Sequence, residues 1–161
     1  MGVLITSRPY TVSQVITNPG AVTSLHIQAP ATKPLVVVRA KISLAQATIP
    51  AAANARVRLQ QYSAAPTSTA IASTLFYNHD TVSGTLDSTA TAGHTVSAGG
   101  TETDFIEEGW GSSTGWLFDW SPTPEEYIVV AAGTGNGFGI KNNVAPPAGN
   151  YIYAITFHEV A

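Results

Sequence analysis

The residues whose types and spacing could support chemistry begin with a group of acids. Glu102, Asp104, Glu107 and Glu108 precede Trp110. Two carboxyl groups on either side of a glycosidic bond carry out glycoside hydrolysis, so the group suggests a hydrolase. Alternation along a strand, however, would place Glu107 and Glu108 on opposite faces. The acids therefore favour a solvated or inter-subunit face, and they lack the loop spacing of an EF-hand calcium site.

The histidines, serines and glycines lack the spacings that accompany catalysis or metal binding. The histidines are His26, His79, His94 and His158, and none lies two or four residues from another, so no zinc signature is present. The residues Gly111-Ser112-Ser113-Thr114-Gly115 match Gly-x-Ser-x-Gly by type, but they fall in an expected turn with no helix after it, so no nucleophile elbow is predicted, and only a triad assembled from distant residues is left open. The glycines at 133, 135, 137 and 139 differ from G-x-G-x-x-G and indicate a hairpin turn. Because cysteine is also absent, the sequence predicts no catalytic residue, no metal and no cofactor.

The aromatic stretch Gly115–Ala132 shows the clearest strand pattern around these acids. Trp116, Phe118 and Trp120 alternate with other residues, so they are expected to share one face of a strand and to pack in a core. Two prolines end that strand near residue 121. The run Tyr127–Ala132 is apolar on both faces and predicts a central strand.

Trp110 lies between two glycines, outside this alternation. Its position predicts a loop and makes it the best candidate for an exposed anchor. Such an anchor could stack on a sugar or contact another subunit, since tryptophan is enriched at interaction hot spots.

Alternation elsewhere predicts eight to ten strands and no helix. Further strands are expected at Tyr10–Thr17, Thr23–Gln28, Leu35–Ala47, Arg56–Ser63, Ala70–Tyr77, Asp104–Trp110 and Tyr151–Val160. In the strand from Leu35, the residues Val36, Val38, Ala40, Ile42 and Leu44 are expected to share the core face. The predicted fold is all-β, a single-domain antiparallel β-sandwich of jelly-roll type over residues 10–161, preceded by an N-terminal arm at residues 1–9.

The segment 78–104 differs in composition from the rest. Of the 21 residues from Thr81 to Thr101, 16 are Thr, Ser, Ala or Gly, so the segment has little apolar surface to bury. It is expected to form a long polar loop or a projecting hairpin with Gly99 and Gly100 at its turn.

Charge is sparse and unevenly distributed. Charged residues make up 11% of the chain; residues 1–79 hold six bases and no acid, and residues 80–161 hold all ten acids and Lys141. Either the two halves interleave so that the charges mix in space, or a basic patch on one subunit meets an acidic patch on another. Six dispersed bases are too few to predict nucleic-acid binding. No apolar run approaches the ~18 residues of a membrane span, and no secretory signal peptide is expected.

The carboxy-terminal third, residues 105–161, resembles the small jelly-roll virion structural proteins of tailed bacteriophages, which include head-decoration (cement) proteins. The resemblance rests on W-x-F-x-W-x-P-x-P-E-E-Y-I-V-V from Trp116, on Gly137-Phe138, on a Pro-Pro loop and on the final Y-x-Y-A-I-T-F-H-E-V. It implies a jelly roll that often forms trimers on the capsid lattice. It implies no catalytic residue.

These observations predict a non-enzymatic virion structural protein that decorates or stabilises a bacteriophage capsid. Its expected partners are the major capsid protein and further copies of itself, with a homotrimer favoured and with no nucleic acid or membrane. Its expected location is the capsid surface, after synthesis in the host cytoplasm. The residues expected to bind partners are Arg8, Tyr10, Glu107, Glu108 and Trp110.

Two alternatives stay open. A carbohydrate-binding or receptor-binding β-sandwich module would need Trp110 or Tyr62 exposed in a groove, and a glycan would then be its partner. A hydrolase would depend on the group of acids alone.

Overall fold

The computed structural model describes residues 9–48, 50–72, 76–78, 89–119 and 128–160. These residues form twelve strands and no helix. The strands are β1 (Pro9–Thr17), β2 (Thr23–Gln28), β3 (Leu35–Leu44), β4 (Asn54–Ala64), β5 (Thr67–Ile71), β6 (Tyr77–Asn78), β7 (Thr91–Ala98), β8 (Thr101–Gly111), β9 (Trp116–Asp119), β10 (Ile128–Val130), β11 (Gly137–Val144) and β12 (Asn150–Glu159). The count exceeds the expected eight to ten because short strands add to the sheet edges. The strand expected at Ala70–Tyr77 is two strands, β5 and β6.

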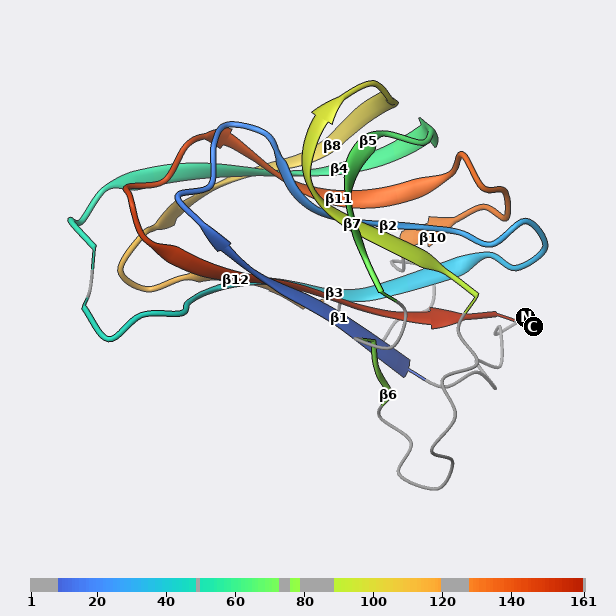
Figure 1. Cartoon of the computed structure of the whole chain (residues 1–161), viewed down its shortest axis with the longest axis horizontal. Helices are drawn as coiled ribbons and strands as arrows, with labels where there is room; N and C mark the ends of the chain where they lie inside the picture. The colour runs from blue at the N-terminus through green and yellow to red at the C-terminus, as the bar shows by residue number, and fades with distance from the viewer. Residues whose placement is uncertain (1–8, 49, 73–75, 79–88, 120–127, 161) are drawn as a thin grey trace.

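Two antiparallel sheets pack face to face (Figure 1). Sheet I has the order β10-β3-β12-β1-β6, and β9 also pairs with β3; sheet II has the order β5-β7-β2-β11-β4-β8. The chain crosses between the sheets at β1–β2, β2–β3, β3–β4, β5–β6, β6–β7, β8–β9, β10–β11 and β11–β12. The predicted all-β sandwich is confirmed, and this strand order is that of a jelly roll. A jelly roll has eight strands. The segment from β5 to β7 is additional to them and is inserted between β4 and β8.

The final strand β12 lies at the centre of sheet I, between β3 and β1. Tyr151, Tyr153, Ile155 and Phe157 all point from it into the core and are fully buried. Each of the aromatic rings removes roughly 150–250 Å² from water, which at about 25 cal/mol/Å² is on the order of 4–6 kcal/mol of transfer free energy. The alternation predicted for this strand is confirmed.

A bulge in β3 changes which of its residues face the core. Thr156 of β12 pairs with Arg39 and Phe157 pairs with Val37, so the ladder skips Val38. Beyond the bulge Ala40 is buried as expected. Before it, Leu35 and Val37 belong to the core cluster, whereas Val36 is buried outside that cluster and Val38 is only partly buried. The expected alternation is therefore wrong in the first half of β3, because one extra residue shifts a period-two pattern by one.

The aromatic stretch lies at the edge of sheet I. β9 pairs with the second half of β3, and β10 pairs with its first half. Trp116 is buried, and its ring lies 6.0 Å from that of Phe118, so their shared face is confirmed. The expected central strand at Tyr127–Ala132 is wrong: β10 is a three-residue edge strand in which Val129 is 54% exposed. Trp120 lies outside the described residues.

The polar segment contributes a strand to sheet II. β4 pairs with β8. The same ladder continues where Thr67 of β5 pairs with Ala98 of β7, so the four strands form one long ribbon. The ribbon bends at Gly99 and Gly100, whose φ angles are 75° and 89°. Beyond the bend, β7 also pairs with β2. The expected projecting hairpin is therefore wrong for Thr91–Ala98, because β7 and β8 pair with different strands; residues 79–88 lie outside the described part.

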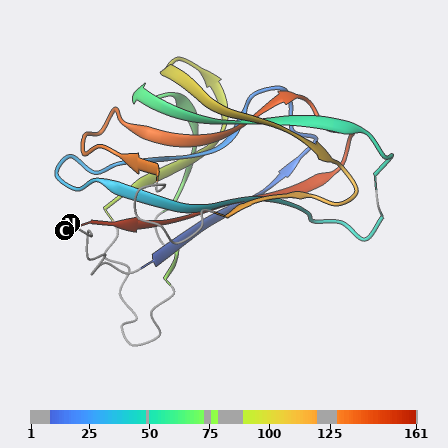
Figure 2. The ribbon, with the colours of Figure 1, turned by 180° about the vertical axis from the view of Figure 1, so that it is seen from behind.

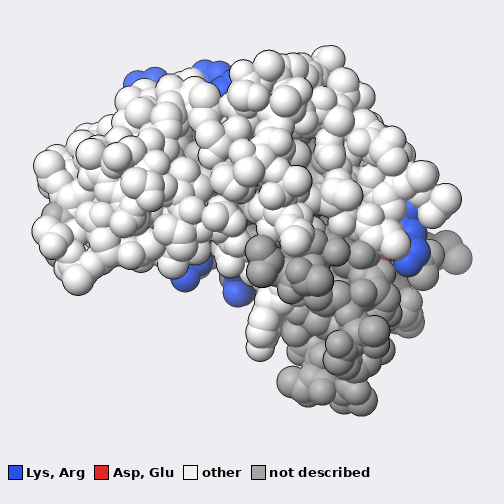
Figure 3. Space-filling model, viewed as in Figure 1, with Lys and Arg blue, Asp and Glu red and all other residues white. Residues whose placement is uncertain are grey.

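The two ends of the sandwich differ in character. One carries the connections β1–β2, β3–β4, β8–β9 and β11–β12, and the first and last described residues lie at the other (Figures 1 and 2). The four connecting segments, 18–22, 45–53, 112–115 and 145–149, contain no charged residue. Figure 3 shows this end without a charged side chain in view. Backbone bonds tie the segments together, as between Asn18 N and Gly149 O at 2.7 Å.

Candidate interaction surfaces

Two of the five residues expected to bind partners are part of the core, and one lies outside the described residues. Tyr10 is 4% exposed, and its ring stacks on Phe157 with the centroids 5.8 Å apart. Its ring is therefore unavailable to a partner. Arg8 belongs to residues 1–8, which the structure does not describe.

Trp110 is 5% exposed, and its ring lies edge-on to Tyr151 at 5.7 Å. The expectation that it is an exposed anchor is wrong. The flanking glycines suggested a loop, but β8 continues through them to Gly111 in register with β4. Trp110 pairs with Ala55, whose small side chain leaves room for the indole in the core.

Glu107 and Glu108 bond in different directions, as their alternation predicted. Glu107 accepts from Arg58 Nε at 3.0 Å and from Asn143 Nδ2 at 3.0 Å. Glu108 instead accepts from Trp116 Nε1 at 2.8 Å, which joins β8 to β9 of the other sheet. Because the two carboxylates lie in separate networks, they do not form a catalytic pair.

The outer face of sheet II carries a network of ion pairs within one chain. Arg58 bridges Glu107 and Asp104, and Lys141 Nζ lies 3.0 Å from Glu102 Oε2. The amide of Gln60 donates to both Glu102 and Asp104. Arg58, from the first half of the sequence, thus pairs with acids from the second half, so on this face the charges of the two halves mix in space.

Electrostatics within this network holds Glu107 ionised. Partial desolvation acts to raise the pKa of Glu107, but the hydrogen bonds from Arg58 and Asn143, with the charges of Arg58 and Arg56, outweigh it and lower the pKa. A carboxylate with a lowered pKa and two guanidinium partners is a poor general acid. The chemistry of this face is therefore ion pairing.

A second polar cluster lies buried where the bent ribbon meets β2. His26 is 2% exposed, and its Nε2 lies 2.7 Å from Ser68 Oγ of β5. Burial, and secondarily the charge of His94, lower the pKa of His26 to about 4, so the imidazole is neutral at pH 7. Among the described residues, nothing hydrogen-bonds its Nδ1, so no carboxylate orients the ring as in a catalytic triad.

Tyr62 completes this buried cluster. Its hydroxyl donates to Thr23 Oγ1 at 2.7 Å, and burial raises the pKa of Tyr62 to about 12. Gly139 opposite it has no side chain, and a Cβ there would lie 2.9 Å from both Tyr62 Cε2 and Thr23 Cγ2. No spacing in the sequence identifies the cluster, because its members come from β2, β4, β5 and β11. Its bonds hold the ribbon to the sheet.

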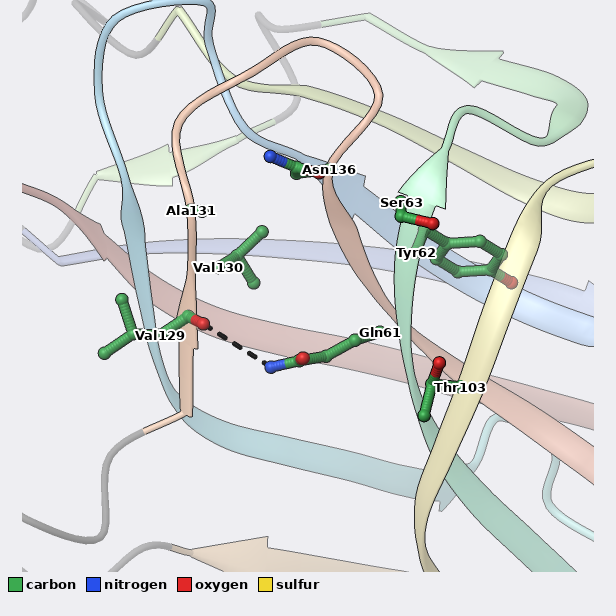
Figure 4. A pocket seen from close by; sticks show the side chains of 8 residues that line it. All are labelled: Gln61, Tyr62, Ser63, Thr103, Val129, Val130, Ala131 and Asn136. Carbon is green, nitrogen blue, oxygen red and sulfur yellow. Dashed lines mark hydrogen bonds between the residues drawn. The ribbon is translucent and has the colours of Figure 1, made fainter.

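A hollow of about 220 Å³ opens between β4, β8 and β10 (Figure 4). Gln61 points across it, and its Nε2 donates to Val129 O at 3.4 Å; the ring of Tyr62 points away. The other lining residues are Ser63, Thr103, Val130, Ala131 and Asn136. Neutral hydroxyl and amide groups of this kind can bind a small polar molecule, but they provide no acid, base or aromatic platform.

The outer face of sheet I presents a different surface. By register and alternation its members are Thr11, Ser13, Val15, Arg39, Lys41, Ser43, Tyr77, Leu117, Ile152, Ala154 and Thr156, which we call the sheet I face. Val15, Tyr77 and Leu117 are 50%, 67% and 58% exposed. Most other members are small, and the hydroxyl groups of Thr11 and Thr156 are hydrogen-bonded to each other at 2.8 Å. Its chemistry suits contact with another surface.

Two properties of the described residues bear on other functions. No group of three or more histidine, aspartate or glutamate side chains in them could hold a metal ion. Within the same residues, no helix has the length and apolar character needed to cross a bilayer. Both statements concern only the described ranges.

No family model, curated protein or solved structure matches this chain. The resemblance to phage head-decoration proteins rests on the pattern in residues 105–161, and the function that it implies stays a prediction.

Proposed function

We propose that this protein is a non-enzymatic virion structural protein that decorates or stabilises a bacteriophage capsid. It binds the major capsid protein of the shell and further copies of itself. The observation that carries the proposal is the sheet I face, an open, weakly charged sheet surface with exposed apolar side chains on a jelly-roll domain. Jelly rolls are a recurrent architecture of viral capsid proteins, which is consistent with this assignment.

Binding on such a surface works through shape and desolvation. Serine, threonine and alanine side chains lose little rotational freedom when they become ordered, so contact with them has a low entropic cost. Exposed Val15 and Leu117 supply apolar area that leaves water on contact. An N-terminal arm at residues 1–9 would add main-chain hydrogen bonds by pairing with the edge of a neighbouring sheet.

The two alternative functions lose their supporting residues. The carbohydrate-binding module needed Trp110 or Tyr62 as an exposed aromatic platform, and both rings are buried. The hydrolase needed two cooperating carboxyl groups, and Glu107 and Glu108 lie in separate networks. A glycan array probed with the full chain tests the first alternative, and saturable binding would restore it.

The proposal is tested with empty shells assembled from the major capsid protein encoded in the same genome. The full chain is expected to co-sediment with the shells in a fixed ratio and to form a stable homo-oligomer by light scattering at micromolar concentration. A monomer that leaves every shell unoccupied would contradict the proposal. A genome with no capsid gene near this one would also count against it.

A further inference from the structure

We propose that the part of the ribbon formed by β5 and β7, which we call the ribbon end, is an acid-sensitive element. It separates from β2 when His26 is protonated, while the two sheets of the sandwich stay packed. The inference goes beyond the proposed function, because it concerns a change of conformation within one chain and holds whether or not the chain binds a shell. The proton acts at the contact between His26 and Ser68.

Ser68 reaches His26 by crossing over β7 at a glycine. Gly93 pairs with His26 on one side and with Ala70 of β5 on the other. A Cβ at Gly93 would lie 2.1 Å from Ser68 Oγ and 2.7 Å from His26 Nε2, so the hydrogen bond occupies the space of the missing side chain. The contact therefore depends on β7 keeping its register against both β2 and β5.

The closed arrangement offers no acceptor for a second proton on the imidazole. In the neutral ring one nitrogen donates and the other accepts, and a hydroxyl group can bond to either, whereas in the imidazolium both nitrogens are donors. Ser68 Oγ can accept from Nε2 of His26, but among the described residues nothing hydrogen-bonds Nδ1, which is buried. Protonation in place would therefore bury a charge together with an unsatisfied N–H, which costs free energy.

In the described chain, the titratable groups around His26 do not compensate that charge. Burial, and then the charge of His94 on β7, lowers the pKa of His26. β4 contributes Tyr62, whose ring lies 6.0 Å away and whose pKa is raised to about 12 by burial, so it is neutral. β5 has no titratable side chain, and β11 contributes Lys141, which is paired with Glu102 of β8. The charged residues Arg56, Arg58, Asp104 and Glu107 of β4 and β8 are paired with one another.

Separation of the ribbon end would expose His26 without opening the main core. Leu25 and Ile27, the neighbours of His26 on β2, belong to the core cluster between the sheets. Because side chains alternate along a strand, His26 points to the outer side of sheet II, where the ribbon end covers it. The ladder between β7 and β2 has four residue pairs. Opening these pairs gives the imidazole access to water while the other face of β2 stays packed.

The ribbon end is also less well stabilised than the rest of the fold. Where β5 has the single residue Ser68, the facing stretch of β7 has three, so the ladder is irregular. Thr95, one of those three, has a φ of 52°, a left-handed conformation that is unfavourable for a β-branched residue. From β5 and β7, the core cluster includes Ile71 and Ala92. Elements with few buried apolar contacts are the ones that open first.

Separate contacts hold the two ends of β7. Glu159 Oε1 accepts from the backbone amides of Thr89 and Ala90 at 2.7 and 2.8 Å, just before the strand begins. After the strand, the ribbon continues through the bend at Gly99 and Gly100 into β4 and β8 (Figure 1). We therefore expect the ribbon end to move between these two points while β4, β8 and β12 keep their positions.

Hydrogen exchange of the full chain, measured by mass spectrometry at pH 7.5 and 4.5, tests this element. After correction for the intrinsic exchange rate, the protection of amides in β5 and β7 should fall on the order of fiftyfold at pH 4.5, because only the open form takes up the proton readily. Exchange of these amides should depend little on added urea, since a local opening exposes little surface. Amides of β3 and β12 should remain better protected and should show the urea dependence of global unfolding.

The urea dependence distinguishes this opening from a general loss of stability in acid. If the amides of β5 and β7 exchange with the same free energy and the same urea dependence as those of β3 and β12 at both pH values, the ribbon end does not separate by itself and the inference is wrong. His26→Gln should remove most of the fall in protection. His94→Gln, at a half-buried position of β7, is the control and should retain most of it.

Gly93→Ala tests the same contact without a change of pH. Its Cβ would displace Ser68 from His26, so the amides of β5 and β7 should lose protection at pH 7.5 while those of β3 and β12 keep theirs. Gly20→Ala is the matched control, because nothing lies within 4 Å of a Cβ at that position. Wild-type protection of the ribbon end in Gly93→Ala would show that the contact does not hold it closed.

Discussion

The buried imidazole of His26 shows how a single side chain is matched to its surroundings. It contacts Ser68 through Nε2, lies with its ring 6.0 Å from that of Tyr62, and has His94 on the neighbouring strand β7. In that environment the neutral form is favoured, because protonation would bury a charge near another histidine. The hydrogen bond between His26 and Ser68 therefore joins β2 to β5. Acid conditions favour the protonated imidazole and so destabilise this contact.

The lowered pKa of His26 predicts that stability falls with acidity between pH 6.5 and pH 4. The pKa of His26 is about 4 in the folded chain, compared with an ordinary value of 6.5. Below pH 6.5 His26 becomes protonated in the unfolded chain but stays neutral in the folded chain. The free energy of unfolding therefore falls as the pH is lowered, until the pH reaches about 4. The loss amounts to about 3 kcal/mol at most.

Urea unfolding at several pH values measures this effect. His26→Gln retains a hydrogen-bonding group but does not titrate, so it should remove most of the slope between pH 6.5 and 4. His94→Gln, at a half-buried position, is the control and should retain most of the slope. Parallel pH profiles for wild type and His26→Gln would contradict the assignment.

At the scale of elements, the bent ribbon is the feature that distinguishes sheet II from a plain four-strand sheet. β4 and β5 run along one side of the ribbon, and β8 and β7 along the other. The side chain of Tyr62 crosses over β11 at Gly139 to reach Thr23. Because Gly139 has no side chain, Tyr62 of β4 can form a buried hydrogen bond with Thr23 of β2.

Gly139→Ala should lower the free energy of unfolding by about 1–3 kcal/mol, the usual cost of overpacking. The new Cβ would lie 2.9 Å from atoms of both Tyr62 and Thr23, and neither neighbour can withdraw without breaking their hydrogen bond. Gly20→Ala is the matched control, because nothing lies within 4 Å of a Cβ at that position. Chemical denaturation compares the two, and equal midpoints would show that the crossing tolerates a methyl group.

The ion pairs between β4 and β8 predict a salt-dependent contribution to stability. Arg58→Met keeps the aliphatic part of the side chain but removes bonds to both Asp104 and Glu107, so it should lower the denaturation midpoint at low ionic strength. The difference from wild type should shrink in 1 M salt, where the Debye length is about 3 Å. Arg56→Met is the control, because Arg56 is more exposed and its Nη1 lies 3.6 Å from Glu107. A loss that is independent of salt would assign the role of Arg58 to packing.

At the scale of the whole molecule, apolar and polar contacts both join the two sheets. The core joins both sheets in one cluster that includes Trp110, Phe138 and Tyr153. Asn142 links them through polar groups as well, since its amide bonds to Ser24 of β2 and to the hydroxyl of Tyr153. Burial raises the pKa of Tyr153 to about 12, which keeps that link neutral. Outside these contacts, Val15 and Leu117 are exposed on the sheet I face.

Much of the fold could be predicted from periodicity, and the errors occurred where pairing changes a side chain's surroundings. β2 has the predicted bounds, and β12 was predicted within one residue at either end, because clean alternation decides both type and face. Trp110 was misplaced because neighbouring glycines indicate a loop unless a long partner strand continues past them. Of the candidate site residues, Glu107 and Glu108 were correctly assigned to opposite faces, whereas the burial of Tyr10 depends on its neighbour Phe157.

The sequence by itself determined the all-β class, the alternation of the central strands and the separation of bases and acids between the two halves of the chain. These are local properties, set by the order of residues along one strand or one half. Only the tertiary structure decided that Arg58 and Lys141 neutralise acids 39 or more residues away from them, that His26 meets Ser68, and that Val15 and Leu117 are exposed on sheet I. The reason is that strand order and register bring residues together without regard to their separation in sequence, so a one-residue bulge or a bend at two glycines changes which groups meet.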